Sequence, residues 1–177
     1  MTTKLLLVGV AVAALVGLLV AQEAAASRGG PKRGPSGLPV EVIKVNGESF
    51  DAEVAADARS RTRGLGGRAT IGPHEAMIFV HPVSDVLNFW MKDCLTDMDI
   101  AFLDRNGKVT AVHTMKKEPP RGADEAMAQY EARLPRYSSE LDAIYAFEFA
   151  PGTLARLGVK PGQTLPLDHG KLRGYLR

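Results

Sequence analysis

The sequence predicts a mainly β (α+β) fold: a single compact, antiparallel, barrel-like sheet with two short helices. The first observation is that two Asn-Gly pairs, Asn46-Gly47 and Asn106-Gly107, each separate short runs rich in apolar residues. This arrangement is typical of β-hairpins with type I′ turns. The second is that about seven short strand-like runs follow one another without the alternating helices of a parallel sheet.

Composition favours one soluble domain without a nucleic-acid partner. The chain has 177 residues, of which 45% are hydrophobic and 24% are charged, as in an ordinary globular domain. Twenty-two basic residues against 20 acidic ones leave a formal charge of +2. This balance does not indicate a basic surface for nucleic acid or for anionic membranes. We also expect the protein to be a monomer.

The N-terminal residues 1–26 are interpreted as a signal peptide. Lys4 precedes the uninterrupted apolar segment Leu5–Ala21, and the small residues Ala24–Ala26 suit a signal peptidase. The alternative is an uncleaved membrane anchor, although the segment is shorter than the roughly 20 apolar residues that span a bilayer. We therefore expect an exported protein, periplasmic or extracellular, that meets the membrane only if this segment is retained.

Residues 27–38 are rich in glycine, proline and basic side chains, and are interpreted as a flexible tether. Cys94 is the only cysteine, so no internal disulfide can stabilise an exported domain of this chain. The apolar core of the domain, residues 39–168, has to provide the stability. Residues 169–177 are expected to form a basic C-terminal tail.

The N-terminal part of the domain shows a hairpin and then a helix. The strands are expected at Val40–Val45 and Ser49–Val54, and Asp57 is a suitable N-cap for a helix that begins at Ala58. The helix is mostly polar and should break at Gly66-Gly67. The arginines on and after it could form either a solvated basic face or a clamp for an anion, since guanidinium groups bind carboxylates and phosphates. Arg59 and Arg61 are interpreted as a solvated basic face.

Later elements are assigned from the same patterns. His81-Pro82 should end the strand Met77–Val80, because proline cannot donate to a ladder. A long loop or lid is expected over Lys116–Asp142, and Gly158 should cap the helix Thr153–Leu157. The further strands are expected at Val86–Met91, Ile100–Leu103, Val109–Thr114, Ala143–Ala150 and Thr164–Leu167.

A polar crossing between two apolar runs is the most distinctive local feature. It comprises Lys92, Asp93, Cys94, Thr96, Asp97 and Asp99. Charged groups between core strands cost free energy to desolvate unless they are paired or face a cleft. Lys92 and Asp99 are therefore expected either to form an ion pair that closes one end of the barrel or to line a ligand pocket.

The only tryptophan lies immediately before this crossing. Strict strand alternation would place Asn88, Trp90 and Lys92 on one face and Phe89 with Met91 on the other. An amide, an indole and an ammonium group on one face are more typical of a polar pocket wall than of an apolar core.

Familiar catalytic and metal-binding signatures are missing from the sequence. Cys94 with His81 or His113 matches no ligand spacing, and a lone cysteine is usually a small buried apolar group. Hydrolase motifs such as Gly-x-Ser-x-Gly and His-Glu-x-x-His do not occur. The sequence therefore predicts no cofactor and no metal.

Five ordered motifs resemble the uncharacterised prokaryotic family called domain of unknown function 192 (DUF192). They are Arg63-Gly64-Leu65 with Arg68, Met77-Ile78-Phe79-Val80, Phe89-Trp90-Met91-Lys92, Asp99-Ile100-Ala101-Phe102, and Leu157-Gly158-Val159-Lys160-Pro161-Gly162. The resemblance extends from Val40 to Leu167, and implies a small, exported, β-rich protein without an established biochemical activity. Gly66-Gly67, Asp93-Cys94 and Met98 depart from the family pattern.

These observations predict an exported binding or accessory protein with a small polar pocket for an unknown small ligand or envelope component. The candidate ligand-binding residues are Arg63, Arg68, Asn88, Trp90, Lys92, Asp93 and Asp99. A second hypothesis is a cell-envelope hydrolase or transferase that uses Asp99 or Asp93 with Lys92. A third is a structural module whose Lys116–Asp142 loop docks a protein partner.

Overall fold

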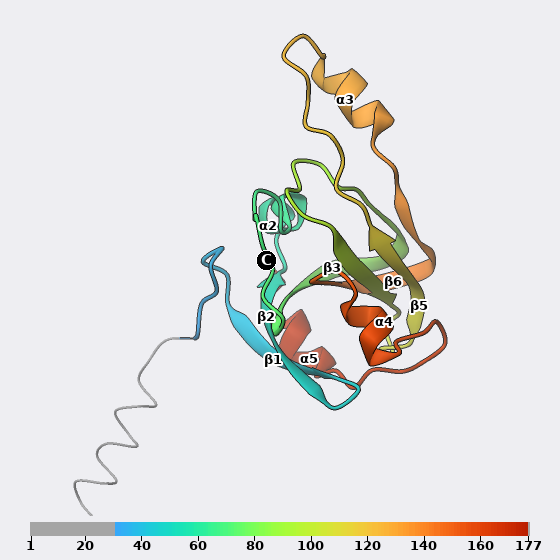
Figure 1. Cartoon of the computed structure of the whole chain (residues 1–177). Helices are drawn as coiled ribbons and strands as arrows, with labels where there is room; N and C mark the ends of the chain where they lie inside the picture. Colours follow the sequence, from blue (N-terminus) through green and yellow to red (C-terminus); the bar gives the residue numbers. More distant parts are fainter. Residues whose placement is uncertain (1–30, 177) are drawn as a thin grey trace, which may run out of the picture. The chain divides into compact units, whose positions relative to one another are not determined.

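The computed structural model describes residues 31–176, of which 33–176 belong to one compact unit (Figure 1). This unit contains one six-stranded sheet with the strand order β1-β2-β3-β6-β4-β5. The strands are β1 (Val40–Val45), β2 (Glu48–Ala55), β3 (Glu75–Phe89), β4 (Met98–Leu103), β5 (Val109–Met115) and β6 (Tyr137–Phe149). The helices are α2 (Ala58–Arg63), α3 (Met127–Arg133), α4 (Thr153–Leu157) and α5 (His169–Arg173).

The mainly β fold is confirmed, and the first hairpin has the turn that its sequence predicts. β1 and β2 pair antiparallel, with Val45 opposite Glu48. Asn46 and Gly47 both have positive φ angles, 48° and 89°, as a type I′ turn requires. The second Asn-Gly hairpin, between β4 and β5, is also antiparallel.

The sheet is largely antiparallel, as the sequence analysis predicts, but one pair of strands is parallel. β2 and β3 run in the same direction, with Ala52 opposite Ala76. A parallel pair needs a long crossover connection, and here residues 56–74, which include α2, provide it. The chain therefore contains a βαβ unit, which the sequence pattern does not reveal because its helix is short.

β3 is one long strand where the sequence predicts two. His81-Pro82 does not end it, because the pairing with β6 shifts between Val80 and Asp85. This irregularity takes Pro82 out of the regular ladder, where its missing N–H would otherwise cost a hydrogen bond. β3 then continues to Phe89, so the strand predicted to reach Met91 ends earlier.

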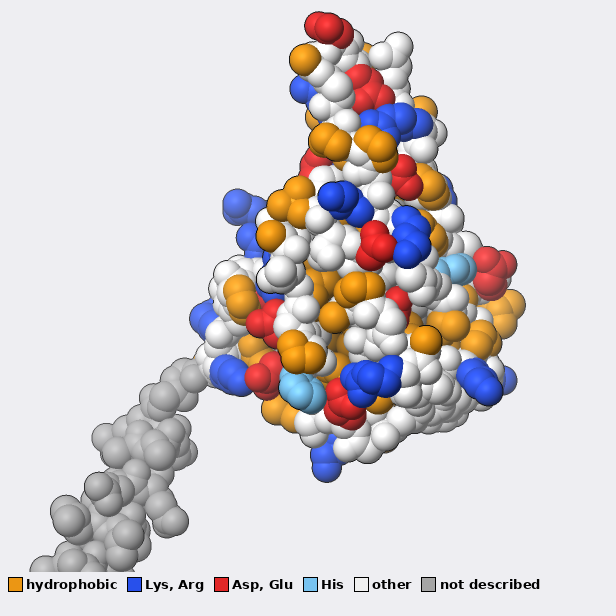
Figure 2. Space-filling view, in the orientation of Figure 1, with side chains coloured by type: hydrophobic (Ala, Val, Ile, Leu, Met, Phe, Trp, Pro, Cys, Tyr) orange, Lys and Arg blue, Asp and Glu red, His pale blue; other side chains and the backbone are white. Residues whose placement is uncertain are grey.

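The predicted loop Lys116–Asp142 also contains regular structure. It includes α3 and the first part of β6, which pairs with the second half of β3. α3 lies on a segment that extends away from the sheet (Figure 1), and we call residues 116–136 the arm. Figure 2 shows acidic and basic side chains intermixed over it.

The sheet does not close into a barrel, because β1 and β5 remain its two edges. Its two faces cover separate apolar clusters. Tyr145 and Phe147 of β6 lie in one cluster with residues of α4 and α5, and Ala146 lies in the other with Leu65 and Phe79. Four short helices occur among residues 31–176, rather than two.

The C-terminal part differs from the prediction. Thr164–Leu167 forms no strand, and its pairing is limited to one isolated bridge between Lys108 and Thr164. The expected basic tail includes α5, whose Leu172 is buried in the core.

The expected signal peptide lies outside the described residues, and so does the start of the expected tether. Within residues 33–38, the backbone N–H of Ser36 donates a hydrogen bond of 2.7 Å to Glu53. The tether stays a prediction. No helix within residues 31–176 has the length and apolar character needed to span a bilayer.

Candidate functional site

A cavity of about 420 Å³ lies beside α2, the second half of β3 and the end of β6. This volume falls within the range of roughly 300–1,000 Å³ that is usual for small-molecule sites. Its lining residues are Ala58, Arg61, Thr62, Arg63, Gly64, Leu65, Gly66, Phe79, His81, Asn88, Phe89, Trp90, Lys92, Cys94, Arg136 and Glu148.

Four of the seven sequence-predicted site residues line this cavity: Arg63, Asn88, Trp90 and Lys92. The structure brings them together although the strand that should have aligned three of them ends at Phe89. The other three, Arg68, Asp93 and Asp99, are not part of the lining.

Glu148 is the most unusual residue of the cavity, because it is a carboxylic acid within a buried strand. It lies between Phe147 and Phe149, whose side chains join the opposite apolar cluster, so alternation turns Glu148 toward the cavity side of the sheet. Only 5% of the residue is exposed, and its Oε2 atom has no hydrogen-bond partner among the described residues. Burial raises the pKa of Glu148 to about 8, against smaller lowering effects of the Leu65 backbone N–H and the Arg68 charge. The carboxyl group is therefore largely protonated at neutral pH, and can donate a hydrogen bond.

Gly64 keeps space open next to this carboxyl group. It ends α2 with a φ angle of 51°, in the left-handed region that favours glycine. A Cβ atom at this position would lie 3.6 Å from Glu148 Oε2 and 3.4 Å from the Phe79 ring. A side chain there would therefore lie directly against the carboxyl group.

His81 is a second polar group of the cavity whose hydrogen-bonding capacity is not fully used. Its Nε2 atom is buried and has no partner among the described residues. Burial, with a smaller contribution from the nearby Arg61 charge, lowers the pKa of His81 to about 4. The imidazole is therefore neutral at pH 7, and can accept or donate one hydrogen bond according to its tautomer.

Cys94 lines the cavity but is a poor nucleophile. Burial, together with the charges of Glu148 and Asp93, raises the pKa of its thiol to about 12. Since the thiolate is the reactive form, very little of it exists at neutral pH. The Sγ atom lies 3.5 Å from the carbonyl oxygen of Lys92.

Cationic and aromatic side chains surround the opening of the cavity. The Arg136 guanidinium lies 3.8 Å from the centroid of the Trp90 ring, and the Lys92 ammonium lies 5.5 Å from it. Lys92 also forms an ion pair with Glu131 of α3. The arm therefore reaches the cavity through a glutamate and an arginine that are distant in sequence from the tryptophan.

The expected ion pair between Lys92 and Asp99 does not form. Asp99 is 1% exposed, and its two carboxylate oxygens accept hydrogen bonds from Thr114 Oγ1 at 3.0 Å and from the Leu154 backbone N–H at 2.9 Å. The alternation of β4 explains this result, because Asp99 shares the face of Ala101 and Leu103, away from the cavity. Asp99 thus stabilises the first turn of α4 instead of lining a pocket.

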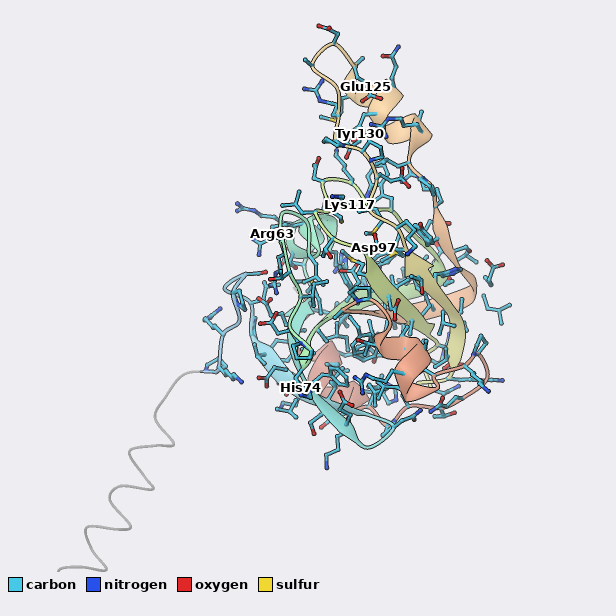
Figure 3. The ribbon with its side chains drawn as sticks, viewed as in Figure 1. Arg63, His74, Asp97, Lys117, Glu125 and Tyr130 are labelled. Atoms are coloured by element: carbon cyan, nitrogen blue, oxygen red, sulfur yellow. The ribbon has the colours of Figure 1, made fainter. Side chains whose placement is uncertain are left out.

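Asp93 and Asp97 connect the polar crossing to the arm. Figure 3 shows Asp97 beside Lys117, at the start of the arm. The Asp93 backbone N–H donates a hydrogen bond of 3.1 Å to the Tyr130 hydroxyl. Asp97 pairs with the Lys116 ammonium at 2.8 Å and accepts from the Lys117 backbone N–H, and these bonds lower the pKa of Asp97. The crossing therefore holds the arm in place, and none of its three carboxylates lines the cavity.

Arg68 lies outside the lining and forms an ion pair with the buried Glu53. Ser36 also bonds to this glutamate through its hydroxyl group, at 3.3 Å. Arg68 thus influences the cavity only indirectly, through its electrostatic effect on Glu148.

The sequence analysis missed Glu148 and Arg136 as site residues, and assigned His81 and Arg61 other roles. A signal for Glu148 exists, because it is the one charged residue in the otherwise apolar strand Ala143–Ala150. Arg136 and His81 have no comparable signal, since the arm and the β3 irregularity bring them to the cavity. Within residues 31–176, no group of three or more His, Cys, Asp or Glu side chains is arranged to hold a metal ion.

Comparisons with known proteins agree with the resemblance noted in the sequence. A family model, DUF192, described as "Uncharacterized ACR", matches residues 41–167. The structure is similar to a crystal structure of a protein of unknown function from Novosphingobium aromaticivorans, with 27% identity and a TM-score of 0.62 over 81% of this chain and 96% of that one. It is also similar to a Sinorhizobium meliloti protein described as a "putative transcription regulator", with 26% identity and a TM-score of 0.55 over 72% of this chain and 90% of that one. No curated protein matches the sequence.

Proposed function

The chain belongs to the DUF192 family, and we propose that it is a binding or accessory protein that holds a small ligand in the cavity beside α2, β3 and β6. The observation that carries this proposal is the buried Glu148 carboxyl group, whose Oε2 has no hydrogen-bond partner among the described residues. An unsatisfied buried polar atom costs about 1–3 kcal/mol. A ligand that bonds to this atom would remove the cost, and the Nε2 atom of His81, which also lines the cavity, offers a second bond.

The walls of the cavity support a ligand with an apolar part. Phe79 and Phe89 meet edge to face, with ring centroids 4.9 Å apart, and Leu65 is also buried there. Pockets of this kind usually combine apolar walls with a few polar groups that orient the ligand.

An envelope hydrolase or transferase that uses Asp99 or Asp93 with Lys92 has less support. The Asp99 carboxylate bonds to Thr114 and Leu154, whereas Lys92 pairs with Glu131, so Asp99 and Lys92 do not converge. Asp93 is close enough to Lys92 to act on its charge, but it does not line the cavity. The high thiol pKa of Cys94 also disfavours nucleophilic catalysis at this cavity.

We propose that binding takes place outside the cytoplasm. This part of the proposal rests on the sequence of residues 1–26, with its apolar segment Leu5–Ala21 and the small residues that follow. N-terminal sequencing of the protein from fractionated cells tests it. A protein that begins after residue 26 and lies outside the inner membrane is expected, whereas an intact N-terminus in the membrane fraction would favour the anchor alternative.

Blocking the cavity tests the binding function. The full chain is incubated with a cell extract and washed, and the small molecules released on denaturation are identified by mass spectrometry. Asn88→Trp places a large side chain at the exposed edge of the cavity, and Asp85→Trp introduces the same change elsewhere on β3. We expect a specific molecule from the wild type and from Asp85→Trp, and a strongly reduced amount from Asn88→Trp. Equal recovery from all three chains, or recovery of no molecule, would contradict the proposal.

A further inference from the structure

The charged residues that line the cavity are almost all cationic. They are Arg61, Arg63, Lys92 and Arg136, with Glu148 as the only acidic one. Because burial holds the pKa of Glu148 at about 8, this carboxyl group contributes little negative charge at neutral pH. The charged groups at the cavity therefore have a net positive charge, even when Glu131 is counted against Lys92, although the chain as a whole is nearly neutral.

Two of these cations already have bonds that fix their positions. Lys92 pairs with Glu131, and Arg61 donates hydrogen bonds to the carbonyl oxygens of Ala56 and Val80, at 2.7 and 3.1 Å. Both side chains contribute positive charge to the opening, but their existing bonds leave them less available to bind a ligand.

Arg63 and Arg136 have more donors available. Neither forms an ion pair with a described residue, and both are exposed at the opening. Arg63 donates one hydrogen bond of 2.9 Å to the carbonyl oxygen of Ser36, and Arg136 donates one of 3.5 Å to that of Glu131. A guanidinium group carries five N–H donors, so each side chain retains enough of them to bind an oxyanion.

The cavity thus changes character with depth. Its exposed edge carries guanidinium groups, its walls are aromatic and aliphatic, and the buried Glu148 at the inner end is an uncharged acid near Gly64. A ligand that matches all three regions has an oxyanion at one end, an apolar middle part and an uncharged polar group at the other end.

We propose that the cavity selects a small organic oxyanion, with its carboxylate or phosphate bound by Arg63 and Arg136 and its uncharged polar group bound by Glu148. This inference rests on the proposed binding function and specifies the chemical class of the ligand. Guanidinium groups suit carboxylates and phosphates alike, because their donor fork matches two oxygens.

Probe compounds that share a ring and a hydroxyl group, but differ in whether they carry an oxyanion, test this inference. 4-Hydroxybenzoate and 4-hydroxyphenyl phosphate carry an oxyanion, a ring and a hydroxyl group, whereas 4-hydroxybenzamide replaces the carboxylate with a neutral amide of similar shape. Binding to the full chain is measured at pH 7 by ligand-observed NMR. We expect at least one oxyanion to bind about tenfold or more tightly than the amide, and a rise in salt concentration to weaken it. The two oxyanions distinguish a carboxylate-selective site from a phosphate-selective one.

Variants assign the effect to the two arginines. Arg63→Gln and Arg136→Gln should each lower affinity for the preferred oxyanion about tenfold and leave binding of the amide nearly unchanged. Arg59→Gln is the matched control, because Arg59 is an exposed arginine on α2 that does not line the cavity.

Equal affinity for the acid and the amide, unchanged affinity in both arginine variants, or binding of neither oxyanion would overturn the inference. Recovery of a neutral molecule from the wild type but not from Asn88→Trp would overturn it as well, while leaving the proposed binding function intact. If neither that experiment nor any probe gave cavity-dependent binding, both proposals would fail.

Discussion

Replacing Glu148 with glutamine should change how the stability of the protein depends on pH. The pKa of this carboxyl group is about 8 in the folded protein, against 4.5 for an ordinary glutamate. Between these pH values the folded state keeps a proton that the unfolded chain has lost. The folded state therefore binds more protons, and the free energy of unfolding falls as the pH rises.

The size of the effect follows from the two pKa values. One pH unit corresponds to about 1.4 kcal/mol, so ionisation of this carboxyl group in the unfolded chain removes about 5 kcal/mol of stability between pH 4.5 and pH 8. This stability is fully present below pH 4.5 and is lost as the pH approaches 8. Glu148→Gln has a similar shape without an ionisable group, and should lack this loss.

His81 has the opposite effect in part of this range. Its pKa is lowered from 6.5 to about 4, so the unfolded chain binds the extra proton and stability rises with pH between these values. The two effects partly cancel between pH 4.5 and 6.5. The interval from pH 6.5 to 8 is therefore the most informative, because only the Glu148 effect remains, at about 2 kcal/mol.

Urea unfolding of the full chain at several pH values between 5 and 9 measures these free energies. The difference in unfolding free energy between Glu148→Gln and the wild type should rise by about 2 kcal/mol from pH 6.5 to 8. Glu140→Gln, at an exposed position of the same strand, should follow the wild type. Parallel profiles for Glu148→Gln and the wild type would refute the assignment of a raised pKa, and with it the uncharged inner end of the cavity.

Three further predictions concern groups around the cavity. Asp99→Ala should lower the free energy of unfolding by about 3 kcal/mol, because it leaves the buried Leu154 N–H without its acceptor. Urea unfolding measures the loss, and an unchanged free energy of unfolding would contradict a structural role for Asp99. Tyr130→Phe removes the acceptor of the Asp93 N–H, so hydrogen exchange in the arm should become several-fold faster, whereas unchanged exchange would mean that other contacts hold it. Cys94 should react with a thiol reagent at pH 7 at least tenfold more slowly in the folded chain than in urea, and equal rates would rule out the raised thiol pKa.

Features set by neighbouring residues could be predicted from the sequence. The β1–β2 turn depends only on the positive φ angles of Asn46 and Gly47. The start of α2 depends on Asp57, whose side chain accepts from the Ser60 N–H at 2.9 Å, and Gly158 ends α4 with a φ angle of 67°. Each of these is a local conformational preference that the residue types largely determine.

Features that depend on distant pairing could not be predicted. The parallel alignment of β2 with β3 requires the crossover to fold back onto the sheet, and no local pattern encodes this step. The partner of Lys92 is Glu131, which reaches it only because the arm contains α3 and is anchored through Tyr130. Four of the predicted site residues nevertheless line the cavity, because the end of β3 with the residues after it carries three of them and the end of α2 carries Arg63.

Among the buried carboxyl groups of residues 31–176, Asp99 and Glu148 lie on opposite sides of the sheet, and their surroundings give them different roles. Both acceptor oxygens of Asp99 have donors, from Thr114 and from the first turn of α4, so its burial is compensated within the fold. Glu148 keeps an oxygen without a partner among the described residues, and its raised pKa reflects that uncompensated burial. Burial of a charged residue is therefore a weaker indication of a binding site than a hydrogen-bonding atom that has no partner within the protein. By this criterion Glu148, the acidic residue in the apolar second half of β6, marks the proposed site more clearly than the group of charges between β3 and β4 does.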